Sequence, residues 1–197
     1  MTQSVSPRVT RKQRRELTDQ LIMDAARAAF IEHGYDHTTL RDIARRAGRS
    51  AGLFFSHHAE KVDVLAEVLH HDLSAELSLI ESIVNDSDSR DSVLMSVLTR
   101  DYDYWRSRAG LCQAWWSRHC AGDKCIVRYT EEARLQTVGM LHEVLKQHGV
   151  KKHYTYTRAD IIWRLHVSYL QNISGATEES NLYVEEMCLK TQLVLVA

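Results

Sequence analysis

Residues 38–58, TTLRDIARRAGRSAGLFFSHH, combine cationic, hydroxyl and small side chains around Gly48. Arginine can bind guanine edges or phosphates, and serine, threonine and histidine can donate hydrogen bonds to phosphate oxygens. Small residues let two helices cross closely, and Gly48 can supply the positive φ of a sharp turn. This combination predicts a helix-turn-helix that binds double-stranded DNA.

A helix in the major groove presents its first turns to the base edges, while the preceding helix lies across the DNA backbone. The residues that we expect nearest the bases are Arg41, Ser50, Ala51, Leu53 and Ser56. The residues that we expect at phosphates are Thr39, Arg45, His57 and Lys61. Arg49 either points toward the DNA or lies over the turn.

The charge distribution favours the same end of the chain. The 197 residues carry a formal net charge of -1, but residues 1–62 carry +4 and residues 63–197 carry -5. A basic segment lies at the start of the first expected helix, and its members are Arg8, Arg11, Lys12, Arg14 and Arg15. This segment either adds salt-sensitive affinity for DNA or is a solvated tail.

Composition predicts an all-α protein, because one proline and eight glycines leave few chain breakers. Apolar residues recur at helical spacing and no strand-like alternation is present. About nine helices are expected, at 11–33, 38–48, 50–57, 60–84, 91–107, 111–120, 123–148, 158–174 and 178–196. No apolar run reaches the length that spans a bilayer, so a cytoplasmic protein without a membrane partner is expected.

The last two expected helices are unusually apolar. They are expected to form half of an intermolecular four-helix bundle, or else one more layer of the chain's own core. The residues assigned to this homodimer interface are Ile162, Leu165, Tyr169, Leu170, Ile173, Leu182, Met187, Leu189 and Leu193.

The middle of the chain crowds aromatic rings together, including Tyr102, Trp105, Trp115, Trp116 and His119. Such rings are either core or the wall of an apolar pocket, where their faces can also hold a cation. Cys120 and Cys125 lie among basic residues, so a reactive thiol is an alternative to inert thiols. The spacing of the histidines and cysteines predicts no metal site, and no cofactor is expected.

The segment GYDHTTLRDIARRAGRSAGLFFSHHAEKVDVL resembles the TetR/AcrR family of transcriptional regulators. The matching positions are Gly34, Tyr35, Thr39, Ile43, Ala44, Ala47, Gly48, Ser50, Gly52, Phe54, Phe55, His57 and Lys61. The sequence departs from the family pattern at Arg49, at His58 and at Phe55, where a tyrosine that binds phosphate is usual.

The resemblance implies a DNA-binding domain over 1–60, with three short helices, and a helical regulatory domain over 61–197. It implies a homodimeric repressor that leaves operator DNA when a small-molecule effector of unknown identity binds. The pocket implied for that effector includes Tyr102, Trp105, Trp115, Trp116, His119 and Tyr169. Two alternatives remain open: a thiol sensor acting through Cys120 and Cys125, and an adaptor or enzyme without DNA binding. An enzyme is not expected, since GxSxG, HExxH and glycine-rich phosphate loops are absent.

Overall fold

The computed structural model describes residues 10–50, 60–85, 90–147, 150, 154–171, 186–187 and 189–191. Within these residues the structure is helical, which confirms the expected fold class, and seven helices are defined. The expected helix after Ser50 and most of the expected helix at 178–196 lie outside the described residues.

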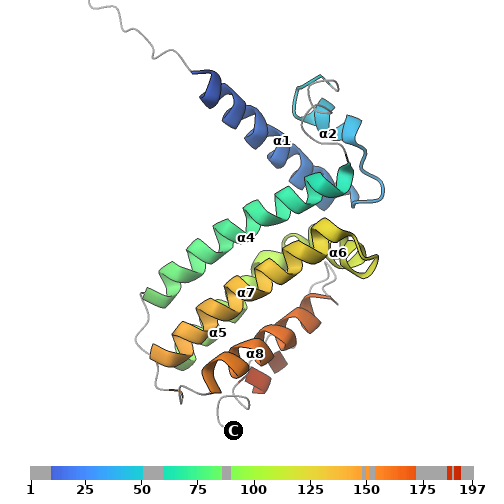
Figure 1. Ribbon diagram of the computed structural model, residues 1–197. Helices are drawn as coiled ribbons and strands as arrows, with labels where there is room; N and C mark the ends of the chain where they lie inside the picture. Colours follow the sequence, from blue (N-terminus) through green and yellow to red (C-terminus); the bar gives the residue numbers. More distant parts are fainter. Residues whose placement is uncertain are drawn as a thin grey trace, which may run out of the picture.

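The N-terminal part contains α1 (Arg11–His33) and α2 (Leu40–Arg46). Helix α1 has the predicted bounds, because Thr10 caps its start and Gly34 ends it at a φ of 77°. Helix α2 packs against α1, and α1 in turn contacts α4 and α6 (Figure 1).

The remaining helices are α4 (Lys61–Asn85), α5 (Arg90–Arg106), α6 (Ala109–Cys120), α7 (Lys124–Gln147) and α8 (Thr155–Leu170). Figure 1 shows α4 running from α1 and α2 along the whole length of this bundle, with α7 and α8 stacked beside it. Helix α8 begins three residues before its predicted start, since Thr155 is buried and starts the helix within the segment predicted as a loop.

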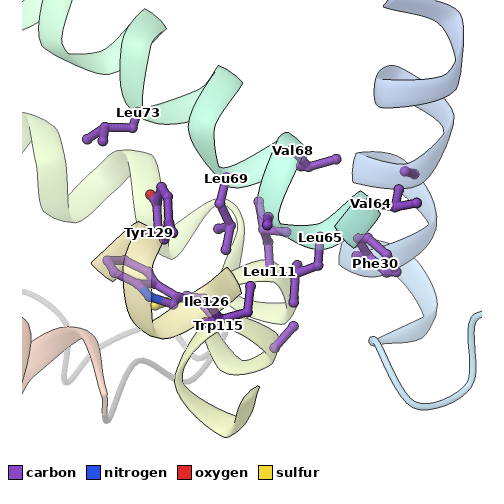
Figure 2. Close-up of a cluster of buried hydrophobic side chains, with 14 of the residues drawn as sticks. Phe30, Val64, Leu65, Val68, Leu69, Leu73, Leu111, Trp115, Ile126 and Tyr129 are labelled. Carbon is purple, nitrogen blue, oxygen red and sulfur yellow. The ribbon is translucent and has the colours of Figure 1, made fainter. Parts of the chain in front are cut away.

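One continuous apolar core joins the two parts of the chain. Figure 2 shows Val64, Leu65 and Val68 of α4 next to Phe30 of α1, while Leu69 and Leu73 continue toward Trp115 and Tyr129. A second core at the other end of the bundle lies between α4, α5, α7 and α8. The residues of α4 just after the predicted boundary at residue 60 therefore share a core with α1, and the boundary itself stays a prediction.

None of the helices within the described residues is long and apolar enough to cross a bilayer.

Candidate nucleic-acid interface and internal cavity

The start of α2 is fixed by a capping box. The Thr39 hydroxyl accepts a hydrogen bond from the Asp42 amide, and the Asp42 carboxylate accepts one from the Thr39 amide, each at 3.2 Å. Hydrogen bonding to Thr39 lowers the pKa of Asp42. Asp42 is therefore ionised near neutral pH and favours the positive end of the α2 dipole.

The end of α2 is fixed by Gly48. Its φ of 63° belongs to the left-handed region that favours glycine. The Arg49 amide donates to the Ala44 carbonyl at 2.9 Å, and the Gly48 amide donates to the Arg45 carbonyl at 3.1 Å. This pair of bonds is a Schellman motif, and it turns the chain sharply toward Ser50.

The arginines of α2 divide into two groups. Arg46 forms a bidentate ion pair with Glu32 of α1, with N–O distances of 2.7 and 2.5 Å. Arg41 is exposed, and the Arg45 side chain is 83% exposed with one contact to Asp42. Arg46 thus docks α2 onto α1, while Arg41 and Arg45 remain at the surface, where a DNA backbone or base edge could reach them.

Lys61 lies where α4 begins and closes the loop between α1 and α2. Its Nζ donates to the carbonyls of Tyr35 at 2.6 Å and Thr38 at 2.9 Å, and it lies 4.1 Å from the centre of the Tyr35 ring. Burial lowers the pKa of Lys61. Two of its three ammonium protons are thus used inside the protein, which leaves one for the predicted phosphate contact.

The remaining predicted DNA contacts are only partly described. Arg49 is half-buried and Ser50 is exposed. The other predicted contacts lie outside the described residues, and they are Ala51, Leu53, Phe55, Ser56 and His57.

A narrow cavity of about 40 Å³ lies within the bundle of α4, α5, α6, α7 and α8. Its walls are mostly apolar and aromatic, including Trp105, Trp115 and Trp163. Four ionisable side chains also line it, namely Glu76, Asp101, Tyr129 and His166. Space of this size holds ordered water, so an organic ligand would have to displace side chains.

Trp105 and Trp115 are the two members of the predicted effector pocket that line this cavity. Trp116 and His119 line a separate, shallow surface depression beside Arg134 and Trp163. The other two predicted members differ again: Tyr102 is buried in the first core, and Tyr169 is half-buried beside the second.

The four ionisable residues of the cavity were not predicted from the sequence. Glu76 follows Leu73 by three residues and precedes Ile80 by four, so its place on the apolar face of α4 could have revealed it. It is 2% exposed. Burial, together with the negative charge of Asp101 and hydrogen bonding with it, raises the pKa of Glu76 to about 12.

The other three polar groups come from different helices. Asp101 of α5 forms an ion pair with His166 of α8, and His166 Nδ1 lies 3.0 Å from Met187 Sδ. The Tyr129 hydroxyl of α7 is buried, and no hydrogen-bond partner is found for it within the described residues. Burial raises the pKa of Tyr129 well above its usual value, so the hydroxyl keeps its proton.

The cysteine environments do not favour thiolates. Cys112 is buried and its thiol donates to the Leu170 carbonyl, while Cys120 is exposed. Burial is the largest effect on Cys125 and raises its pKa, so this thiol is less ionised than a free one. Cys188 lies outside the described residues. No group of three or more metal-ligating side chains occurs in the part of the chain that the structure describes.

The residues assigned to a dimer interface divide by exposure. Ile162, Leu170 and Met187 are buried inside the protomer, because they pack on its own cores. Leu165 and Tyr169 are half-buried and Leu189 is 61% exposed. The three other assigned residues, Ile173, Leu182 and Leu193, lie outside the described residues.

A capped α2, the Schellman turn that follows it and a helical bundle behind them match the first helix and the turn of a helix-turn-helix protein with a helical second part. Residues 22–68 match the family model described as "Bacterial regulatory proteins, tetR family". The resemblance to the TetR/AcrR family is thereby confirmed, and these residues are a TetR-family N-terminal domain.

The relatives are transcriptional regulators and not enzymes. The chain is similar to the transcriptional repressor AcnR of Corynebacterium jeikeium, with 34% identity over 65 residues that make up 32% of this chain. The match spans only about a third of that repressor's length (34%). The AcnR of Corynebacterium diphtheriae matches at 34% identity over 53 residues, which are 27% of this chain and 28% of that protein.

Solved structures share the fold of nearly the whole chain. A TetR transcriptional regulator from Legionella pneumophila has a TM-score of 0.72 at 16% identity, over 98% of this chain and 100% of that chain. FadR from Bacillus subtilis, solved in complex with stearoyl-CoA, has a TM-score of 0.67 at 15% identity, over 86% of this chain and 97% of that one.

Proposed function

We propose that this protein is a ligand-responsive transcriptional repressor that binds operator DNA as a homodimer and leaves it when a small-molecule effector enters the bundle. Such a regulator works in the cytoplasm, where bacterial operators are. The observation that carries the proposal is the capped α2 with the Schellman turn after it, within the segment that matches the TetR family.

The proposed DNA contacts follow from the surface of α2. Arg41 and Arg45 extend from a helix whose two ends are fixed, so their positions are set before DNA binds. Arg41 is proposed to read a base edge and Arg45 to hold a phosphate. The contacts proposed for the segment beyond the turn are those predicted from the sequence.

The proposed effector site is the cavity next to Trp105 and Trp115. It lies among α4 to α8, and α4 and α6 both contact α1, so a change of shape there would reach the helix that supports α2. FadR, which shares the fold, was solved with a small-molecule ligand. That precedent supports an effector for this chain without indicating its chemistry.

Selection of bound duplexes from a random pool with the full chain tests DNA binding. We expect enrichment of a two-fold symmetric site. Arg41→Ala should change the preferred bases, with a discrimination of about 1–3 kcal/mol at the affected position. Lys61→Ala should weaken all sequences alike and lower the salt slope by about one.

Arg128→Ala is the control, because this arginine is also exposed but belongs to α7 and is not a predicted DNA contact. Absence of any enriched sequence, or an Arg41→Ala variant that selects the same bases with the same affinity as the control, would reject the proposed operator binding.

A further inference from the structure

The internal cavity contains two buried carboxyl groups although its walls are mostly apolar. Glu76 and Asp101 bring two carboxyl groups from α4 and α5 to one wall, and His166 of α8 pairs with only one of them. A carboxyl group at the Glu76 position contributes nothing to an apolar core that leucine would not supply better. The pair therefore calls for a role outside packing.

The groups around Glu76 leave it uncharged in the closed cavity. Asp101 and Asp72 raise its pKa and Arg108 lowers it, while burial has the largest effect. Tyr129 of α7 and Cys112 of α6 are neutral, because burial raises the pKa of each. Glu76 thus keeps its proton because burial and the two neighbouring carboxylates outweigh the effect of Arg108.

Tyr129 supplies an independent sign of a ligand. Its hydroxyl is buried, lines the same cavity and has no hydrogen-bond partner within the described residues. A buried hydroxyl without a partner is unfavourable, so a group that accepts or donates a hydrogen bond there would be stabilising. The rings of Trp115 and Tyr129 lie 5.3 Å apart, edge to face, beside it (Figure 2).

We propose that the cavity, which widens as its lining side chains are displaced, binds a compact organic cation, a protonated amine, with its ammonium group against Glu76, Asp101 and Tyr129 and its apolar body against Trp105 and Trp115. This assignment rests on the proposed function, because it names the chemical class of the effector. Aromatic faces attract cations, and an anionic ligand would instead meet two carboxyl groups.

Binding exchanges one positive charge for another. When the ammonium group enters, Glu76 gives its proton to solvent, and the carboxylate that remains pairs with the amine. The amine keeps its own proton throughout. One proton is therefore released for each amine bound at a pH where the free amine is protonated.

Three probes of nearly equal shape test the proposal on the full chain: benzylamine, benzyl alcohol and benzoate. Tryptophan fluorescence reports binding, because Trp105 and Trp115 line the cavity, and calorimetry in two buffers of different ionisation enthalpy counts protons. We expect benzylamine to bind at least tenfold more tightly than the other two and to release about one proton near pH 7.

Two variants locate the site. Glu76→Gln keeps the shape of the neutral side chain, and it should abolish the preference for benzylamine over benzyl alcohol and the proton release. Tyr129→Phe should weaken benzylamine binding while the fold is kept. Glu81→Gln, an exposed residue of the same helix, is the matched control and should behave like the unchanged protein.

The proposal is overturned if benzoate or benzyl alcohol binds as tightly as benzylamine, if none of the three binds, or if Glu76→Gln keeps the amine preference. These titrations contain no DNA. Failure of the proposed operator binding would appear only in the DNA selection, so the two failures are distinguishable.

Discussion

Arg27 of α1 and Asp72 of α4 form an ion pair in which Nε of the guanidinium group lies 2.7 Å from Oδ1 of the carboxylate. Asp72 is 2% exposed, and Arg108 lies 3.6 Å from its second oxygen. Glu76 is one helical turn further along α4. On successive turns of α4, Asp72 thus contacts α1 and Glu76 lines the cavity. A change of shape at the cavity could be passed to α1 through these two residues.

Asp72→Asn should destabilise the protein, because it removes the buried carboxylate that Arg27 and Arg108 share and leaves Arg27 with Asp24 alone. Loss of one partner of a buried ion pair costs about 3 kcal/mol or more. Urea unfolding followed by circular dichroism measures this. Asp19→Asn, whose partner Arg15 is 4.0 Å away on the surface of α1, should leave the unfolding midpoint unchanged. Equal behaviour of the two variants would show that the buried pair contributes little.

Gly110 of α6 permits the close approach of α6 to α1. A Cβ atom there would lie 2.7 Å from the Phe30 carbonyl oxygen and 3.0 Å from that of Ile31, and backbone atoms cannot easily give way. Gly110→Ala should therefore cost about 1–3 kcal/mol of unfolding free energy.

Gly139 is the matched control for Gly110. A Cβ atom there meets nothing within 4 Å and its position is inside α7. Gly139→Ala should stabilise the protein by about 0.5–1 kcal/mol in the same urea unfolding experiment. Opposite signs for the two substitutions are expected, and a Gly110→Ala variant as stable as the unchanged protein would contradict the packing described for α6.

The sequence predicted the ends of α1 and the turn after α2, because capping and glycine geometry depend on neighbours in the chain. It could not decide which rings line the cavity. Trp115 and Trp116 are adjacent on α6 and so point in directions about 100° apart, and only their packing shows that Trp115 lines the cavity. The apolar pattern of α8 likewise could not show whether its residues pack within the protomer or against a partner. Leu170 packs in the chain's own core.

The surface of α8 offers an apolar stripe to a second copy of the chain. Ile161, which is 40% exposed, and the half-buried Leu165 are spaced four residues apart on one side. Lysine at both positions should give folded monomers in sedimentation equilibrium, because two charges would be buried at the interface. Leu170→Asp should unfold the protein instead.

Leu135→Lys is the control for that experiment, because Leu135 is 50% exposed on α7. It should leave the dimer intact. A dimer that survives both lysines on α8 would move the interface to another surface.

The raised pKa of Glu76 links the stability of the protein to pH. In the unfolded chain this group has an ordinary pKa of 4.5, whereas in the folded protein its pKa is about 12. Between these values the unfolded chain binds fewer protons than the folded protein. The free energy of unfolding is therefore highest, with respect to this group, below pH 4.5. It falls as the pH rises from 4.5 toward 12.

Glu76→Gln should remove this dependence, since the amide has a similar shape and does not titrate in that range. The difference in unfolding free energy between Glu76→Gln and the unchanged protein should grow in favour of glutamine by about 1 kcal/mol per pH unit. Urea unfolding at pH 6, 7.5 and 9 measures the slope, and Glu81→Gln, exposed on the same helix, should show none. Parallel curves for Glu76→Gln and the unchanged protein would mean that Glu76 is already ionised at neutral pH, and a cation could then pair with it without releasing a proton.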